Sequence, residues 1–306
     1  MHKVKLLFKQ QSLQKYLSII ESVQPPNLLI DKSNGEDADI VFGEPSLIRD
    51  QLPELHSVKW VQSSWAGVEP LLSPSLRRNY QLTNARGVFG GLMSEYVFGY
   101  LLMHERKILP RFYSQQKSEW NNSLPGTLRG KTIGIMGTGS IGLLLAKTAR
   151  HFGMRVLGYS RNSETCEDIE RYYHGDDITE FASHLDILIN VLPNTKYTTK
   201  IVNERVLSAL PKNSVFINAG RGSTLDETAL LQAIEQNHFA MVVLDVFEQE
   251  PLPPKHPLWH AKNVYISSHT AAPSIPEDIC KLFFENYKLF SSGQPLKFLV
   301  DFDLGY

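Results

Sequence analysis

The chain has 306 residues, of which 42% are hydrophobic and 21% are charged, and these values are typical of a folded globular protein large enough for two domains. Its 31 Lys and Arg residues nearly balance its 32 Asp and Glu residues, which gives a formal net charge of −1. That balance excludes an overall basic field for binding nucleic acid or an anionic membrane surface, so an anionic substrate would have to meet a local cation.

The first 95 residues alternate short apolar runs with a helical pattern. The predicted strands are Lys3–Lys9, Ala38–Phe42 and Trp60–Gln62, and Ser12–Val23 is a predicted helix with apolar residues along one face. This order of elements is typical of a small parallel α/β unit.

The compartment is predicted from the N-terminus and the cysteines. Lysines interrupt the apolar N-terminal stretch, which therefore lacks the core of a signal peptide, and no run approaches the roughly 18 apolar residues of a membrane span. Cys166 and Cys280 lie in neither a CxxC nor a metal-ligand pattern, so we expect reduced thiols and no metal site. These features predict a cytoplasmic protein that does not bind membranes.

A long helical pattern follows, from Gly91 to about Ser114, with no proline before Pro110. An amphipathic or buried helix accounts for it. A helix of this length can also bridge two domains or form a dimer face.

The pattern of strands and helices becomes regular after residue 126. Buried-strand patterns occur at Lys131–Met136, Arg155–Tyr159, Asp186–Val191, Ser214–Asn218, Met241–Leu244 and Val264–Ser267, with helices between most of them. We therefore predict an α/β fold with two Rossmann-like domains built on doubly wound parallel sheets. A nucleotide-binding domain of residues 96–275 is inserted into a substrate domain of residues 1–95 and 276–306, because the last helix, Pro276–Ser291, leads the chain back to the first domain.

A glycine-rich loop follows the first of these strands. It reads Gly137-Thr138-Gly139-Ser140-Ile141-Gly142, a GxGxxG that ends a strand and opens a helix. In that context the glycines allow a tight turn, a close approach of backbone to a pyrophosphate, and close packing of helix on strand. The helix N-terminus then faces the phosphates, so the loop predicts a bound dinucleotide.

The residues after the next strand predict which dinucleotide is bound. An acidic residue at this position would bind the ribose 2′-hydroxyl of NAD, but the chain has Ser160-Arg161-Asn162, and the nearest acid, Glu164, comes late. Ser160 and Arg161 suit a 2′-phosphate, so we predict a preference for NADP(H), with NAD(H) also possible.

Three late segments each follow a strand and carry reactive side chains. They contain Arg221, Glu250 and His269. Because the carboxyl ends of parallel strands line the ligand crevice of an open sheet, we expect these side chains to converge. Histidine titrates near pH ~6.5 and suits general acid–base work, and an arginine fork suits a planar anion.

These segments, the glycine loop and Leu192-Pro193-Asn194-Thr195 together resemble the D-isomer-specific 2-hydroxyacid dehydrogenase family. Earlier matches are Gln62–Val68 and Thr83–Gly87, and the ending Val300–Tyr306 looks like the glyoxylate/hydroxypyruvate reductase branch. The resemblance covers essentially the whole chain and implies an NAD(P)-dependent reductase of a small 2-oxo acid. It also implies, with the long helix, a homodimer.

The resemblance also implies roles for individual residues. His269 would be the general acid and base, Glu250 would orient and charge it, and Arg221 would bind the substrate carboxylate and carbonyl oxygen. Further implied cofactor contacts are Leu192, Pro193, Ala219, Gly220 and Asp245, with Asp245 on the nicotinamide side. In the first domain, backbone N–H groups around Ala66 and Gly67 would hold the substrate carboxylate.

Trp65 departs from the family pattern, which has glycine at this position. Its indole either narrows the substrate pocket or packs into the domain core, and this alternative leaves the identity of the oxo acid open. The alternatives are a phosphoglycerate dehydrogenase-like enzyme, an enzyme that oxidises formate or phosphite, and a non-enzymatic NAD(P)-sensing regulator on the same fold.

Overall fold

The computed structural model describes residues 1–33, 35–161 and 166–305, so Asn162 and Glu164 of the predicted ribose site and the terminal Tyr306 lie outside the described residues. The chain divides into two compact units, Met1–Val88 with Ser274–Tyr306, and Phe89–Pro273. The predicted domain junctions lie at 95/96 and 275/276. The first junction of the structure instead precedes a helix that begins at Gly90, because a continuous helix stays within one unit.

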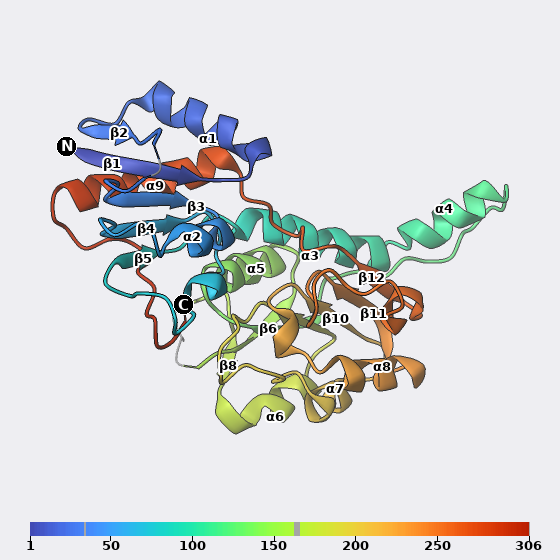
Figure 1. Ribbon diagram of the computed structural model, residues 1–306. Coiled ribbons are helices and arrows are strands. Elements are labelled where there is room, and N and C mark those ends of the chain that lie inside the picture. The colour runs from blue at the N-terminus through green and yellow to red at the C-terminus, as the bar shows by residue number, and fades with distance from the viewer. Residues whose placement is uncertain (34, 162–165, 306) are drawn as a thin grey trace. The chain divides into compact units, whose positions relative to one another are not determined.

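The first unit is built on a parallel sheet (Figure 1). Within its described residues the strand order is β2-β1-β3-β4-β5. The strands are β1 (His2–Leu7), β2 (Leu28–Ile30), β3 (Ile40–Gly43), β4 (Trp60–Ser63) and β5 (Gln81–Thr83), and the helices are α1 (Gln10–Val23), α2 (Pro45–Gln51) and α9 (Pro276–Ser291). The short strands β2 and β5 were not predicted.

The C-terminal helix completes the core of this unit. Phe283 of α9 is fully buried, and its ring stacks on Phe42 of β3 at a centroid distance of 4.4 Å and on Trp60 of β4 at 5.4 Å. On the opposite face of the sheet, Val41 packs in a cluster with Ile48 of α2. Both faces of the sheet are therefore covered, as a parallel sheet requires.

The second unit is a larger parallel sheet with strand order β12-β11-β10-β9-β6-β7-β8 among the described residues. Its strands are β6 (Thr132–Met136), β7 (Arg155–Tyr159), β8 (Arg171–Tyr173), β9 (Ile187–Asn190), β10 (Ser214–Asn218), β11 (Phe239–Leu244) and β12 (Val264–Ile266). Its helices of five or more residues are α3 (Gly90–Glu105), α4 (Ile108–Gln116), α5 (Ser140–His151), α6 (Ile178–Ser183), α7 (Glu204–Ala209) and α8 (Glu227–Glu235).

Alternating side chains of the central strands pack into two hydrophobic cores, one on each face of the sheet. In β10, Phe216 joins the cluster formed with α6, α7 and α8, whereas Val215 and Ile217 join the cluster formed with α3 and α5. Figure 1 shows these two helical layers on opposite faces of the sheet. The predicted α/β class, with doubly wound parallel sheets and one domain inserted into the other, is confirmed.

The predicted single helix over Gly91–Ser114 is wrong. The structure has two helices, α3 and α4, separated at Lys107, whose φ of 53° is left-handed. In a continuous helix Pro110 would lack one hydrogen bond, and its ring would clash with the carbonyl four residues earlier. After the break it lies in the first turn of α4, where a missing N–H costs nothing.

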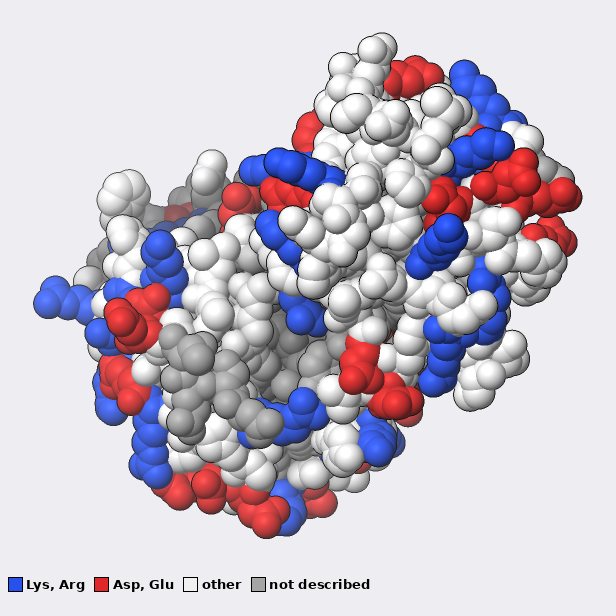
Figure 2. Space-filling view, turned by 90° about the vertical axis from the view of Figure 1, so that its left-hand side faces the viewer, with Lys and Arg blue, Asp and Glu red and all other residues white. Residues whose placement is uncertain are grey.

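Charged side chains of both signs are interspersed over the face that Figure 2 shows, in agreement with the net charge of −1. Across the described part of the chain, no helix combines the length and apolarity that crossing a bilayer requires. Within the same residues there is no group of three or more His, Cys, Asp or Glu side chains placed to hold a metal ion.

Candidate active site

The glycine loop lies between β6 and α5, as predicted. Gly137 has a φ of 99°, a conformation that side-chain-bearing residues rarely adopt. A Cβ added to Gly142 would lie 2.1 Å from the carbonyl oxygen of Gly137, so only glycine lets the first turn of α5 pack on the loop. The N-terminal N–H groups of this 12-residue helix and its dipole suit the loop to binding an anion.

Other predicted cofactor residues meet at the ends of β9 and β10. A Cβ on Gly220 would lie 2.7 Å from the carbonyl oxygen of Leu192, so these two segments are in direct backbone contact. In the glycine loop, Thr138 is 3% exposed and its Oγ1 has no hydrogen-bond partner among the described residues. A buried hydroxyl without a partner fits a ligand that supplies one, and the loop as a whole fits a dinucleotide pyrophosphate.

Ser160 follows β7 and is 7% exposed, whereas Arg161 is exposed. The backbone N–H of Ser160 donates to the carbonyl of Tyr173, and its own carbonyl accepts a hydrogen bond from His174 Nδ1 at 2.7 Å. The predicted ribose site therefore has a histidine beside it that was not predicted. Its only sequence signal is its place directly after β8.

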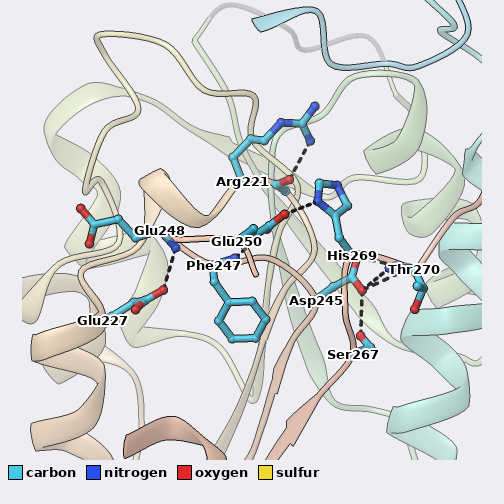
Figure 3. Close-up of polar contacts among 11 residues, drawn as sticks. Arg221, Glu227, Asp245, Phe247, Glu248, Glu250, Ser267, His269 and Thr270 are labelled. Carbon is cyan, nitrogen blue, oxygen red and sulfur yellow. Dashed lines mark hydrogen bonds and ion pairs between the residues drawn. The ribbon is translucent and has the colours of Figure 1, made fainter. Parts of the chain in front are cut away.

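Arg221, Glu250 and His269 come from the loops after β10, β11 and β12, which are neighbours in the sheet. Figure 3 shows the three side chains gathered at this edge, with His269 Nδ1 2.8 Å from Glu250 Oε2. The second carboxylate oxygen of Glu250 accepts the backbone N–H of Phe247 at 3.0 Å. The guanidinium of Arg221 donates to the carbonyl of Gly220 at 2.8 Å.

The charges of this cluster shift its pKa values. The hydrogen bond to Glu250 raises the pKa of His269, while burial and the positive charge of Arg221 lower it, and the net pKa is raised. Burial raises the pKa of Glu250, but hydrogen bonds from His269 and from the N–H of Phe247 outweigh burial, and the net pKa is lowered. The carboxylate beside Nδ1 favours the form of the imidazole that carries a proton on that nitrogen.

Asp245 directly follows β11, is 2% exposed, and holds the loop that carries His269. One carboxylate oxygen accepts Ser267 Oγ and the N–H of Thr270, both at 2.8 Å, and the Asp245 carbonyl accepts the N–H of His269 at 2.8 Å. This loop needs support because His269 has a φ of 55°, a left-handed conformation that costs a non-glycine residue about 1–3 kcal/mol. The expected contact of Asp245 with nicotinamide stays a prediction.

Tyr96 of α3 extends this support and was not predicted. Its hydroxyl lies 2.7 Å from Ser267 Oγ, which donates to Asp245. Burial raises the pKa of Tyr96, so the phenol stays protonated and able to donate. No local sequence pattern distinguishes Tyr96 from the other residues of α3 for such a role.

Trp65, Ala66 and Gly67 lie in the first unit, after β4, whereas the residues above lie in the second unit. Ser63 holds this segment through hydrogen bonds of its hydroxyl with the backbone N–H and carbonyl of Trp65, and Asn84 Nδ2 donates to the carbonyl of Ala66 at 2.9 Å. Trp65 is 37% exposed, so it does not pack into the core of its unit. Substrate binding by this segment stays a prediction.

Comparison with known proteins identifies the family. The model of the D-isomer specific 2-hydroxyacid dehydrogenase NAD binding domain matches residues 98–271. Glyoxylate/hydroxypyruvate reductase A of Serratia proteamaculans is 35% identical over 214 residues, which are 70% of this chain and 68% of that protein. Glyoxylate reductase of Aeropyrum pernix is 29% identical over 305 residues, covering 92% of this chain and 89% of that protein.

Two solved structures extend the likeness to almost the whole chain. A D-isomer specific 2-hydroxyacid dehydrogenase family protein of Aeromonas salmonicida has a TM-score of 0.92 and 37% identity, with 99% of both chains covered. The NADPH-dependent glyoxylate/hydroxypyruvate reductase of Sinorhizobium meliloti, in complex with NADP and sulfate, has a TM-score of 0.86 and 28% identity, with 100% of both chains covered. The chain therefore belongs to the D-isomer specific 2-hydroxyacid dehydrogenase family and is an NAD(P)-dependent oxidoreductase.

Proposed function

We propose that this enzyme reduces glyoxylate, hydroxypyruvate or a related small 2-oxo acid to its 2-hydroxy acid, with NADPH as the preferred donor. The observation that carries the proposal is the contact of 2.8 Å between His269 Nδ1 and Glu250 Oε2, with Arg221 in the same cluster. The names of the relatives from Serratia proteamaculans and Aeropyrum pernix support the substrate class.

The proposed reaction divides among three side chains. Arg221 binds the substrate carboxylate and carbonyl oxygen through its fork of N–H donors, which also polarises the carbonyl. His269 donates the proton on Nε2 to the carbonyl oxygen, and Glu250 stabilises the protonated imidazole until that transfer. The nicotinamide cofactor, when bound, supplies the hydride that reaches the carbonyl carbon. In the oxidising direction His269 takes the proton back.

The proposed cofactor site consists of the glycine loop and the residues after β7. The N–H groups at the start of α5 and the Thr138 hydroxyl bind the pyrophosphate, and Ser160 with Arg161 binds the 2′-phosphate. Solved relatives that contain NADP or NADPH, from Sinorhizobium meliloti and Xanthobacter autotrophicus, support this preference.

The first test combines a substrate panel with loss of the proposed acid. We expect NADPH oxidation with glyoxylate or hydroxypyruvate, and a fall in kcat of roughly 10²–10⁴-fold in His269→Ala because proton transfer is lost. The cofactor dissociation constant should not change. Unchanged turnover in His269→Ala would show that another group is the acid, and a preference for 3-phosphohydroxypyruvate would favour the phosphoglycerate dehydrogenase-like alternative.

The second test follows the reduction rate against pH. Reduction needs protonated His269. We therefore expect kcat/KM to remain high at pH values somewhat above the ordinary histidine pKa, and to fall as the pH rises through the raised pKa. Glu250→Gln removes the carboxylate, and we expect the alkaline limb to move down to about pH 6.5 or lower. The control is Glu248→Gln, an exposed acid two residues away. Coincident limbs for wild type and Glu250→Gln would refute the assigned role of Glu250.

The third test separates the two cofactors. Arg161→Ala should lower kcat/KM for NADPH roughly 10- to 100-fold, the value of one charge-assisted hydrogen bond, and leave kcat/KM for NADH unchanged. Arg171→Ala is a matched control, because Arg171 is an exposed arginine on β8 that pairs with Glu180. Equal losses of kcat/KM with both cofactors would mean that Arg161 does not bind the 2′-phosphate.

We propose further that the enzyme is a homodimer that uses α4 and the segment after it. In α4, which is described throughout, no residue is buried, and Phe112 is 50% exposed. Trp120 is 94% exposed in the following segment. Large apolar side chains exposed together favour association.

Sedimentation of the wild type should therefore give twice the chain mass of 34.7 kDa. The double variant Phe112→Ser with Trp120→Ser should dissociate into monomers at a higher protein concentration than the wild type does, since it loses apolar contact area. Leu29→Ser, at an apolar residue of the first unit that is 46% exposed, serves as the control. A double variant that sediments as the wild type does at every concentration would exclude this face.

A further inference from the structure

Glu227 is a buried acid that the proposed reaction does not use. It is the first residue of α8, is 9% exposed, and follows Asp226, whose side chain caps the helix by accepting the N–H groups of Thr228 and Ala229. Since Asp226 already caps the helix, capping does not explain why a second carboxylate is buried at this helix end.

Both oxygens of Glu227 are directed at the segment that follows β11. Oε1 accepts the backbone N–H of Glu248 at 2.8 Å, and Oε2 lies 3.4 Å from His256 Nε2. Figure 3 shows the Glu227 carboxylate reaching the backbone nitrogen of Glu248, while the Glu248 side chain points away from it. Glu227 therefore contacts this segment at two points, eight residues apart.

The segment that Glu227 contacts also contains Glu250. The N–H of Phe247 donates to Glu250 Oε1 at 3.0 Å, and Glu250 Oε2 contacts His269 at 2.8 Å. A continuous series of hydrogen bonds and one peptide bond thus leads from Glu227 to the imidazole. The first hydrogen bond uses the N–H of Glu248 and the second uses the N–H of Phe247, so the position of Glu250 depends on where that peptide lies.

The turn that carries Arg221 fixes the other side of the same peptide. A Cβ added to Gly222 would lie 1.9 Å from the carbonyl carbon of Phe247 and 2.5 Å from the nitrogen of Glu248. The peptide between Phe247 and Glu248 is therefore packed against Gly222 and hydrogen-bonded to Glu227. Movement of this peptide would shift Glu250 and the Arg221 turn together.

We propose that Glu227 is a positioning residue for the reaction. It holds the Phe247–Glu248 peptide so that Glu250 contacts His269 and the turn that carries Arg221 keeps its place against the same peptide. This inference rests on the proposed function of His269 and Glu250. Catalytic groups must be held to within a fraction of an ångström, and a displacement of about 1 Å can lower a rate roughly 100-fold.

The test compares three variants in the full-length enzyme. Glu227→Ala removes the acceptor of the Glu248 N–H, Glu227→Gln keeps an acceptor oxygen at the same reach, and Glu235→Ala removes an exposed acid from the other end of α8. We expect kcat to fall roughly 10- to 100-fold in Glu227→Ala with the cofactor dissociation constant unchanged, and Glu227→Gln and Glu235→Ala to stay near the wild type.

The pKa of His269, followed by NMR titration, gives a readout that loss of folding stability alone would not move. His269 faces Glu250, Arg221 and Asp245, and only its contact with Glu250 should loosen in Glu227→Ala. Its pKa should then fall toward ~6.5, and the alkaline limb of the reduction rate should move down with it. Where Glu227→Ala does not fold, Glu227→Asp, which withdraws the oxygen by one methylene, should shift both readouts in the same direction.

Two outcomes would overturn the inference: a His269 pKa that is the same in wild type and Glu227→Ala (or Glu227→Asp), or a Glu227→Gln variant as impaired as Glu227→Ala. Failure of the proposed function would look different. His269→Ala would then keep its turnover, while the NMR titration of His269 would still report whether Glu227 controls the contact with Glu250.

Discussion

Parallel pairing of β10, β11 and β12 is the constraint on which the active site depends. Parallel strands place all their carboxyl ends at one edge, so the loops carrying Arg221, Glu250 and His269 leave the sheet side by side. The same pairing requires a crossover after each strand and apolar cover on both faces. The two core clusters and the helices around them follow from that requirement.

The charges in the cluster have opposing effects on His269. The positive charge of Arg221 lowers the pKa of the His269 imidazole. Glu250 offsets this effect, because its hydrogen bond to Nδ1 raises the same pKa. A carboxylate hydrogen-bonded to the imidazole thus favours a protonated histidine even beside a cationic arginine.

The parts of the site that could be predicted from the sequence are those marked by a particular residue type directly after a strand. The glycine loop and the three residues Arg221, Glu250 and His269 each follow a buried strand, so their meeting could be inferred. The sequence did not predict Glu227 or the loop-holding role of Asp245, because both accept backbone N–H groups, which every residue except proline offers. The break between α3 and α4 was missed because the effect of Pro110 extends one turn before it.

The packing of Phe283 on Phe42 and Trp60 has a consequence for synthesis of the chain. Residues 1–88 leave the ribosome long before α9, so their sheet has one face without its last helix while the next 185 residues, Phe89–Pro273, are made. The inserted unit is continuous in sequence and can fold as soon as it has emerged, whereas the unit that begins the chain finishes last. During that interval the Phe42 side of the sheet lacks the ring stacking that Phe283 supplies in the finished unit.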